Sequence, residues 1–284
     1  MKKELESYFI IPQSAVRIIR QSQLARSQKG LDKLYYIVSS LYCNQYKNFS
    51  PNYRGFLPLH SSILKRFLGN KLYTTFLREL MNIGIIEMSA MYVPGQVSRG
   101  YRLKEPFRSD KAITIRIKDS KIASKKLTMR VTPEDYSSTV DRFLIKSLRN
   151  ICIEYKDALK QLKIDLENKE KYTEYHFNSD FVAITDIATG QWRYSRDDFG
   201  NRAHHNLTNY RGSLKRFLKV NESEPLIGLD IANSQPFLFN IVLGKLFKEG
   251  LPSDAKKYKE LTSQGMLYAY IQEHLESKHI FLRL

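Results

Sequence analysis

Hydrophobic residues recur at helical spacing through the first part of the chain. Segment 12–27 is typical of a helix, and apolar side chains between 31 and 41 form one stripe three and four residues apart. A short helix is predicted within 57–69, capped by His60 or Ser61 and closed by Gly69. Another helix is predicted over 71–82. The side chains expected to face inward on it are Leu72, Phe76, Leu77 and Leu80.

The pattern then changes to short extended runs. Gly84 stands where a helix end favours a left-handed residue, and apolar runs at 85–89 and 100–103 flank a Pro-Gly turn, which predicts a β-hairpin. Residues 110–119 alternate polar and apolar positions and predict a strand. From 133 to 167 the helical spacing returns and predicts one long connecting helix. Its apolar side comprises Phe143, Leu144, Leu148, Ile151, Tyr155, Leu159 and Leu162.

Three helices followed by a hairpin, over roughly residues 28–105, resemble a winged helix-turn-helix domain. The segment 77–87 resembles that family's junction between the recognition helix and the first wing strand. The resemblance implies that helix 71–82 enters the major groove of DNA while the hairpin follows the phosphate backbone. Winged helices also serve as protein–protein modules, so that alternative stays open. The implied contacts are Thr75, Arg78 and Asn82 with bases or phosphate, and Gln96, Ser98 and Arg99 with phosphate.

Net charge supports a polyanionic partner. The 284 residues carry a formal charge of +17, and residues 1–110 hold 17 Lys and Arg against 7 Asp and Glu. A positive field of this size attracts nucleic acid, although a charge that only serves solubility is the simpler alternative. Hydrophobic residues at 42% and charged residues at 26% are globular values, so a packed core is expected.

Cysteine usage and the N-terminus bear on the compartment. Cys43 and Cys152 are far apart, with no partner at the spacing of a zinc site or disulfide framework. The first residues mix charges and lack the apolar core of a signal peptide, and no apolar run is long enough to span a bilayer. A cytoplasmic protein without membrane contact, zinc or an organic cofactor is expected.

A block between 197 and 236 carries the candidate chemistry. An apolar run at 225–229, typical of a buried strand, ends in Asp230 and a polar turn. A carboxylate in that position is a candidate Mg²⁺ ligand, and nearby arginines would suit phosphoryl transfer. Asp230 could equally cap the following helix. The local basic patch consists of Arg202, Arg211, Lys215 and Arg216.

The order of landmarks in residues 197–275 resembles the palm of family A DNA polymerases. These landmarks are a Gly-x-Arg, a Leu-Thr-Asn, an Arg-Phe, an Asp after an apolar run, and a Ser-Gln. The chain is also similar to replication proteins of bacterial mobile elements with an Asp-x-x-Asn-Ser-Gln-Pro signature. The resemblance implies a catalytic, metal-binding Asp230, with phosphate, template or nucleotide contacts from Arg202, Asn209, Arg216 and Gln235, beside Ser234.

The chain departs from that family in several places. Two extra residues separate Asp230 from Ser234, and Pro236 and Phe237 replace the family's Ile-Glu pair. No later segment resembles the family's motif B or motif C, although two-metal chemistry needs a second carboxylate. The palm-like region is therefore expected to be truncated and inactive as this chain alone.

Weaker candidates lie in the same region. His204 and His205 are expected to contact nucleic acid or pack rather than bind metal, and Trp192 and Tyr194 either stack on a base or belong to the core. The candidates for additional metal ligands are Asp186, Asp197 and Asp198.

The sequence thus predicts an α+β protein with three parts. These are a winged-helix DNA-binding domain at 1–110, a strand and helical connector at 111–190, and a partial palm at 191–284. We expect a DNA-binding replication protein of a mobile element, plasmid or phage that contacts duplex DNA and a primer-template, with Mg²⁺-dependent nucleotidyl transfer. The alternatives are a non-catalytic initiator or regulator, and a metal-dependent nuclease or transposase.

Overall fold

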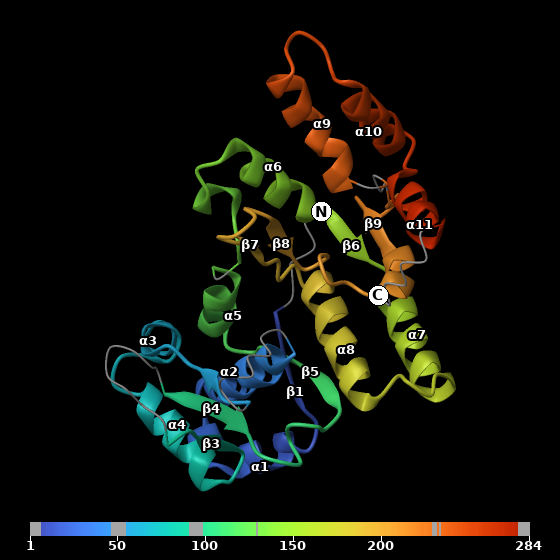
Figure 1. Cartoon of the computed structure of the whole chain (residues 1–284). Coiled ribbons are helices and arrows are strands. Elements are labelled where there is room, and N and C mark those ends of the chain that lie inside the picture. The colour runs from blue at the N-terminus through green and yellow to red at the C-terminus, as the bar shows by residue number, and fades with distance from the viewer. Residues whose placement is uncertain are drawn as a thin grey trace. The chain divides into compact units, whose positions relative to one another are not determined.

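A computed structural model of the whole chain shows a mixed α+β protein (Figure 1), which confirms the predicted class. The structure describes residues 7–46, 55–90, 99–128, 130–228, 232 and 234–277. The chain divides into two compact units, Met1–Leu226 and Ile227–Leu284. No helix among the described residues has the length and apolar character needed to cross a bilayer. The three-part division expected from the sequence stays a prediction.

Two strands far apart in the sequence pair with each other in the larger unit. Strand β1 (Tyr8–Pro12) pairs antiparallel with β5 (Ala112–Arg116), and Figure 1 shows them side by side. The strand expected within 110–119 is confirmed, whereas β1 was not predicted. Phe9 and Ile11 are buried, so this ribbon supplies part of the core.

Helices α1 (Ala15–Gln21) and α2 (Gln28–Gln45) follow β1, joined by a 3₁₀ turn at Gln23–Arg26. The helix predicted over 12–27 is confirmed for Ala15–Gln21. It ends at Ser22, because the Ser22 hydroxyl accepts a hydrogen bond from the backbone N–H of Leu24 and starts the 3₁₀ turn. The Ser27 hydroxyl caps α2 by accepting from Gly30 N–H. The predicted apolar stripe of α2 is buried at Leu34, Ile37, Val38 and Leu41.

A second group of elements packs around α2. Strand β2 (Leu57–Pro58) precedes α3 (Ser61–Leu68) and α4 (Tyr73–Asn82), and β3 (Ile86–Met88) and β4 (Gly100–Leu103) follow. The three strands form one antiparallel sheet in the order β2-β4-β3. Both helices and both predicted hairpin strands are confirmed, and Gly84 has the expected positive φ, at 78°. The predicted turn at 93–98 lies outside the described residues.

The expectation for Leu72 is wrong. Its side chain is 50% exposed, because Leu72 caps α4 one position before the first helical residue and lies outside the inward face. Phe76, Leu77 and Leu80 are buried as predicted.

The long helix expected over 133–167 is also wrong. The structure has a 3₁₀ turn (Pro133–Asp135), α6 (Thr139–Leu148), β6 (Ile151–Ile153) and α7 (Tyr155–Asn168). The break has a local cause, since Ile151 and Ile153 are β-branched and pair with strand β9 (Leu218–Val220). Phe143, expected on the apolar side of that helix, is 67% exposed on α6.

Helix α8 (Glu174–Ala188) comes next and packs against α7 and β6. A hairpin of β7 (Tyr194–Arg196) and β8 (Ala203–His205) follows it, then a 3₁₀ helix (Gly212–Phe217) leading into β9. Strand β10 (Glu224–Pro225) completes the sheet β10-β9-β6. The buried strand expected at 225–229 is wrong for residues 226–228, which form no strand and expose Leu226 and Ile227.

The smaller unit consists, in its described part, of α9 (Ser234–Leu246), α10 (Ser253–Ser263) and α11 (Leu267–Ser277). The helix expected after Asp230 is confirmed as α9. Two hydrogen bonds fix α10 on α9, from Asn240 Nδ2 to Thr262 Oγ1 at 2.8 Å and from the Tyr258 hydroxyl to the Pro236 carbonyl at 3.0 Å.

Candidate nucleic-acid interface

Helix α4 has two different faces. Phe76, Leu77 and Leu80 point into the core, and the side chains at i, i+3 and i+7 on the other face are exposed. Those exposed residues are Thr75, Arg78 and Asn82. The structure therefore brings these three predicted side chains together on one accessible face. Their hydrogen-bonding groups are suited to base edges and phosphates.

Cations dominate the surface of α3 and α4. Residues 61–82 contain Lys65, Arg66, Lys71 and Arg78, all exposed, and one carboxylate. That carboxylate, Glu79, accepts a 2.5 Å hydrogen bond from the Ser22 hydroxyl and so also ties α4 to the end of α1. Most of the charge on these helices is thus free to meet a polyanion.

The two arginines at strand β4 have different environments. Arg102 on β4 forms a 2.6 Å ion pair with Glu87 on β3, and its guanidinium lies 4.2 Å from the centre of the Phe56 ring. Arg99, just before β4, is exposed and hydrogen-bonds to Tyr101. Arg102 therefore stabilises the sheet, while Arg99 stays at the surface. The other predicted wing residues, Gln96 and Ser98, lie outside the described residues.

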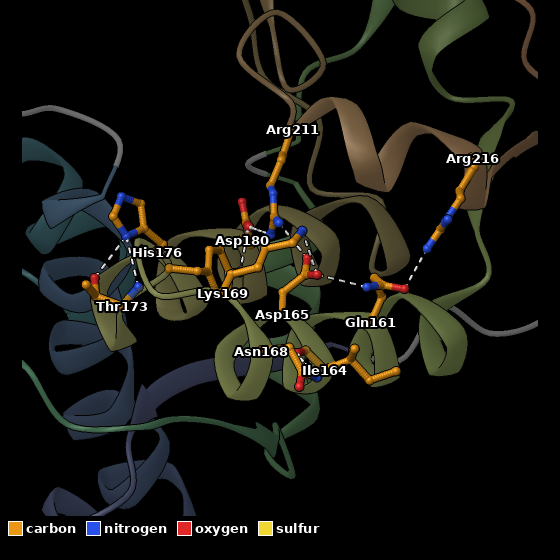
Figure 2. Close-up of polar contacts among 11 residues, drawn as sticks. Gln161, Ile164, Asp165, Asn168, Lys169, Thr173, His176, Asp180, Arg211 and Arg216 are labelled. Atoms are coloured by element: carbon orange, nitrogen blue, oxygen red, sulfur yellow. Dashed lines mark hydrogen bonds and ion pairs between the residues drawn. The ribbon is translucent and has the colours of Figure 1, made fainter.

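The basic patch predicted within residues 202–216 does not form one cationic surface. Figure 2 shows the Arg211 guanidinium reaching between two carboxylates, Asp165 on α7 at 2.5 Å and Asp180 on α8 at 3.0 Å. It also lies 4.3 Å from the centre of the Tyr172 ring. Sequence reasoning missed these three partners. Arg211 has the position of a brace between the segment after β8 and the α7–α8 hairpin.

The charges in this brace stabilise one another. Burial alone would raise the pKa of Asp165, but its contacts with Lys169, Gln161 and Arg211 outweigh burial and lower it. Burial likewise opposes the charge of Arg211, while the hydrogen bond to Asp180 leads the contacts that raise its pKa. The hydroxyl of Tyr172 donates to Asp180 at 2.7 Å, so the pair is closed by a third group.

The other three cations of the patch are Arg216, Lys215 and Arg202, and none of their side chains forms an ion pair with a carboxylate in the described part of the chain. Arg216 donates to Gln161 Oε1 at 2.5 Å, and Gln161 donates in turn to Asp165 (Figure 2). Lys215 and Arg202 are exposed. The phosphate and template roles predicted for these residues stay predictions.

The predicted metal ligand Asp230 lies outside the described residues. Gln235 is exposed in the first turn of α9, in the smaller unit. Asp186 is buried in α8, Asp198 is exposed, and Asp197 contacts His204. Within the described ranges no three His, Cys, Asp or Glu side chains gather as metal ligands would. Binding of Mg²⁺ at Asp230 stays a prediction.

The aromatic candidates belong to the core. Trp192 and Tyr194 are both buried, and the Tyr194 hydroxyl donates to Asp141 at 2.6 Å, where Arg196 also binds. His204 Nε2 lies 2.8 Å from Asp197 Oδ2, and this contact, with the backbone N–H of Gly200, lowers the pKa of Asp197 to about 2. Burial lowers the pKa of His205.

Comparison with known proteins adds no further assignment. No protein-family model matches the chain, and no curated protein or solved structure matches it significantly.

Proposed function

We propose that the chain is a DNA-binding protein that contacts duplex DNA through α4 and the adjoining strands of a winged helix. The arrangement of residues 28–103 carries the proposal. Helices α2, α3 and α4 are followed by the strands β3 and β4, and β2 joins them in the sheet β2-β4-β3. This is the order expected for a winged helix, in which the third helix is the one presented to the major groove.

The surface chemistry of α4 supports the same proposal. Arg78 can donate two hydrogen bonds to a guanine edge, Asn82 can pair with adenine, and Thr75 suits either bases or phosphate. The four exposed cations of residues 61–82 would supply the sequence-independent attraction to phosphate. A protein partner at the same face would need an acidic surface to gain from this excess of positive charge.

The test measures duplex binding by fluorescence anisotropy as a function of salt. We expect Arg78→Ala to weaken binding by roughly tenfold and, if Arg78 contacts phosphate, to reduce the salt slope by about one. Arg149→Ala, which removes an exposed arginine at the end of α6, is the matched control and should leave both quantities unchanged. Equal affinity of the wild type and Arg78→Ala would contradict groove insertion by α4.

A replication role extends this proposal and rests on the resemblance of residues 197–275 to family A polymerase palms. Its test is a primer-extension assay of the full-length protein with Mg²⁺. If Asp230→Ala extends primers as well as the wild type, the polymerase function is wrong. Cleavage without nucleotides would favour a nuclease, and salt-sensitive duplex binding without either activity would favour an initiator or regulator.

A further inference from the structure

A cavity of about 490 Å³ lies in the larger unit, away from the face of α4. It is bounded by the end of α2, one face of α8, the β7–β8 hairpin and the turn after β8. This volume falls within the roughly 300–1,000 Å³ of small-molecule sites. The lining residues that matter are Asn44, Ser179, Arg193, Ser195, His205 and Asn209.

Carboxylates are absent from the lining of this cavity, as far as the described residues show. The nearest ones along the chain are engaged elsewhere, since Asp180 binds Arg211 and Tyr172, and Asp197 binds His204. Asp186 lines a neighbouring cavity of about 320 Å³. The larger cavity therefore offers an anion no repelling group in its wall.

The cavity has one cationic side chain, that of Arg193, without a partner in the described part of the chain. Arg193 is exposed, and its guanidinium makes no hydrogen bond or ion pair within the described part of the chain. Its backbone is fixed, because Arg193 N–H donates to Asn206 Oδ1 at 2.7 Å and Asn206 Nδ2 donates to the Gln191 carbonyl. A fixed backbone that carries a free guanidinium suits a phosphate, which accepts paired hydrogen bonds from it.

His205 adds a neutral donor. Its Nδ1 accepts a hydrogen bond from Leu207 N–H at 3.2 Å, so the proton of the neutral ring must sit on Nε2. Burial favours this neutral form by lowering the pKa of His205. The ring can therefore donate to a bound oxygen without carrying a charge of its own.

Among the described residues, four further polar side chains of the wall are also without a partner, whereas His204, Asn206 and Thr208 are engaged within the protein. Within the described ranges, the side chains of Asn44, Ser179, Ser195 and Asn209 have no hydrogen-bond partner. Apolar atoms of Val182 and Ala183 complete the wall. Amides beside an apolar strip can recognise the edge and face of a base.

We propose that this cavity binds a nucleoside 5′-phosphate, with the phosphate near Arg193 and the base against the α8 wall. The inference does not depend on duplex binding by α4, because the two surfaces share no residue. The ligand would be either a free nucleotide or the 5′-phosphorylated end of a strand, since both present the same chemistry.

Isothermal titration of the full chain tests the proposal with dAMP, deoxyadenosine and inorganic phosphate as probes. We expect dAMP to bind with 1:1 stoichiometry and at least tenfold more tightly than either fragment. Arg193→Gln and Asn209→Ala should each weaken dAMP binding, the former by roughly tenfold because it removes a charge-assisted hydrogen bond. Arg26→Gln, an exposed arginine that lines no described cavity, is the matched control and should bind like the wild type.

Folding of the variants is checked by circular dichroism, and both substituted side chains are exposed and without partners in the described part of the chain. Competition of dAMP by a 5′-phosphorylated tetranucleotide would identify strand ends as ligands, and its failure would identify free nucleotides. Absence of dAMP binding at millimolar concentration overturns the proposal. So does binding that Arg193→Gln and Asn209→Ala leave unchanged.

Discussion

The brace formed by Arg211 allows a direct choice between two roles for this residue. The sequence predicts a phosphate contact, whereas the structure gives Arg211 two carboxylate partners. Replacing it by methionine keeps much of its aliphatic volume and removes the charge. If the brace is what Arg211 provides, Arg211→Met should destabilise the larger unit. If phosphate binding is its role, the substitution should weaken nucleic-acid binding and leave stability nearly unchanged.

The expected magnitude follows from burial. Asp165 has a side chain only 2% exposed, and truncating one partner of a buried ion pair costs about 3–5 kcal/mol. The cost should be smaller here, because Asp165 keeps Lys169 at 2.7 Å and Gln161 at 2.9 Å. Arg211 and Asp180 are also partly exposed, at 23% and 16%, which weakens their interaction. We therefore expect a loss of about 2–3 kcal/mol.

Thermal and urea unfolding measure this loss. For a unit of this size the melting temperature should fall by roughly 5–10 °C. Because the folded-state pKa of Asp165 is lowered, its stabilising charge is fully present above the unfolded carboxyl pKa of about 3.9 and is lost as the pH falls through the folded value. The difference between wild type and variant should therefore be complete at pH 7 and shrink below about pH 4.

The control is Arg216→Met. Arg216 is exposed and, in the described structure, contacts Gln161 and the ring of Phe217, so its removal should cost less than about 1 kcal/mol. A loss below about 1 kcal/mol for Arg211→Met, or a loss that does not diminish in acid, would refute the role of Arg211 as a brace.

Three further predictions concern other parts of the larger unit. Leu80→Ala should cost about 2–5 kcal/mol in urea unfolding because Leu80 is fully buried, whereas Leu72→Ala, at an exposed position, should cost less than about 0.5 kcal/mol; similar losses would contradict the assigned face of α4. Asn178→Ala should cost about 1–3 kcal/mol in the same assay. The buried Asn178 Oδ1 accepts a hydrogen bond from Ala112 N–H at 3.0 Å, and removing it would leave that donor unpaired. An unchanged unfolding midpoint would show that β5 does not need this bond. In carboxyl-carbon NMR titrations Asp197 should stay charged until about pH 2, and His204→Ala should move its pKa up towards the ordinary value near 3.9, because the His204 contact favours the charged carboxylate; an unmoved titration would exclude that contact.

Local patterns predicted the elements of the α4 region well. Helical spacing identified α4, and the Pro-Gly turn between apolar runs identified β3 and β4. The exposed face of Thr75, Arg78 and Asn82 followed from their spacing alone. These features depend on neighbours within a few residues, which a sequence displays directly.

Features that depend on distant partners were not predictable in this way. Asp165 and Asp180 lie 46 and 31 residues before Arg211, and no local pattern pairs them with it. The helical spacing from 133 to 167 continues through Ile151 and Ile153. It therefore gave no sign of strand β6, which forms only by pairing with β9. The cavity beside α8 is likewise assembled from four separate segments.

The pairing of β1 with β5 has a consequence for how the protein is made and dissected. These strands lie about a hundred residues apart, so a nascent chain cannot complete the ribbon until β5 has left the ribosome. Until then Phe9 and Ile11 stay exposed on an unpaired edge, a hazard for aggregation. A fragment ending at residue 110 would keep that edge permanently. The smallest soluble piece that carries α4 should therefore extend beyond Arg116.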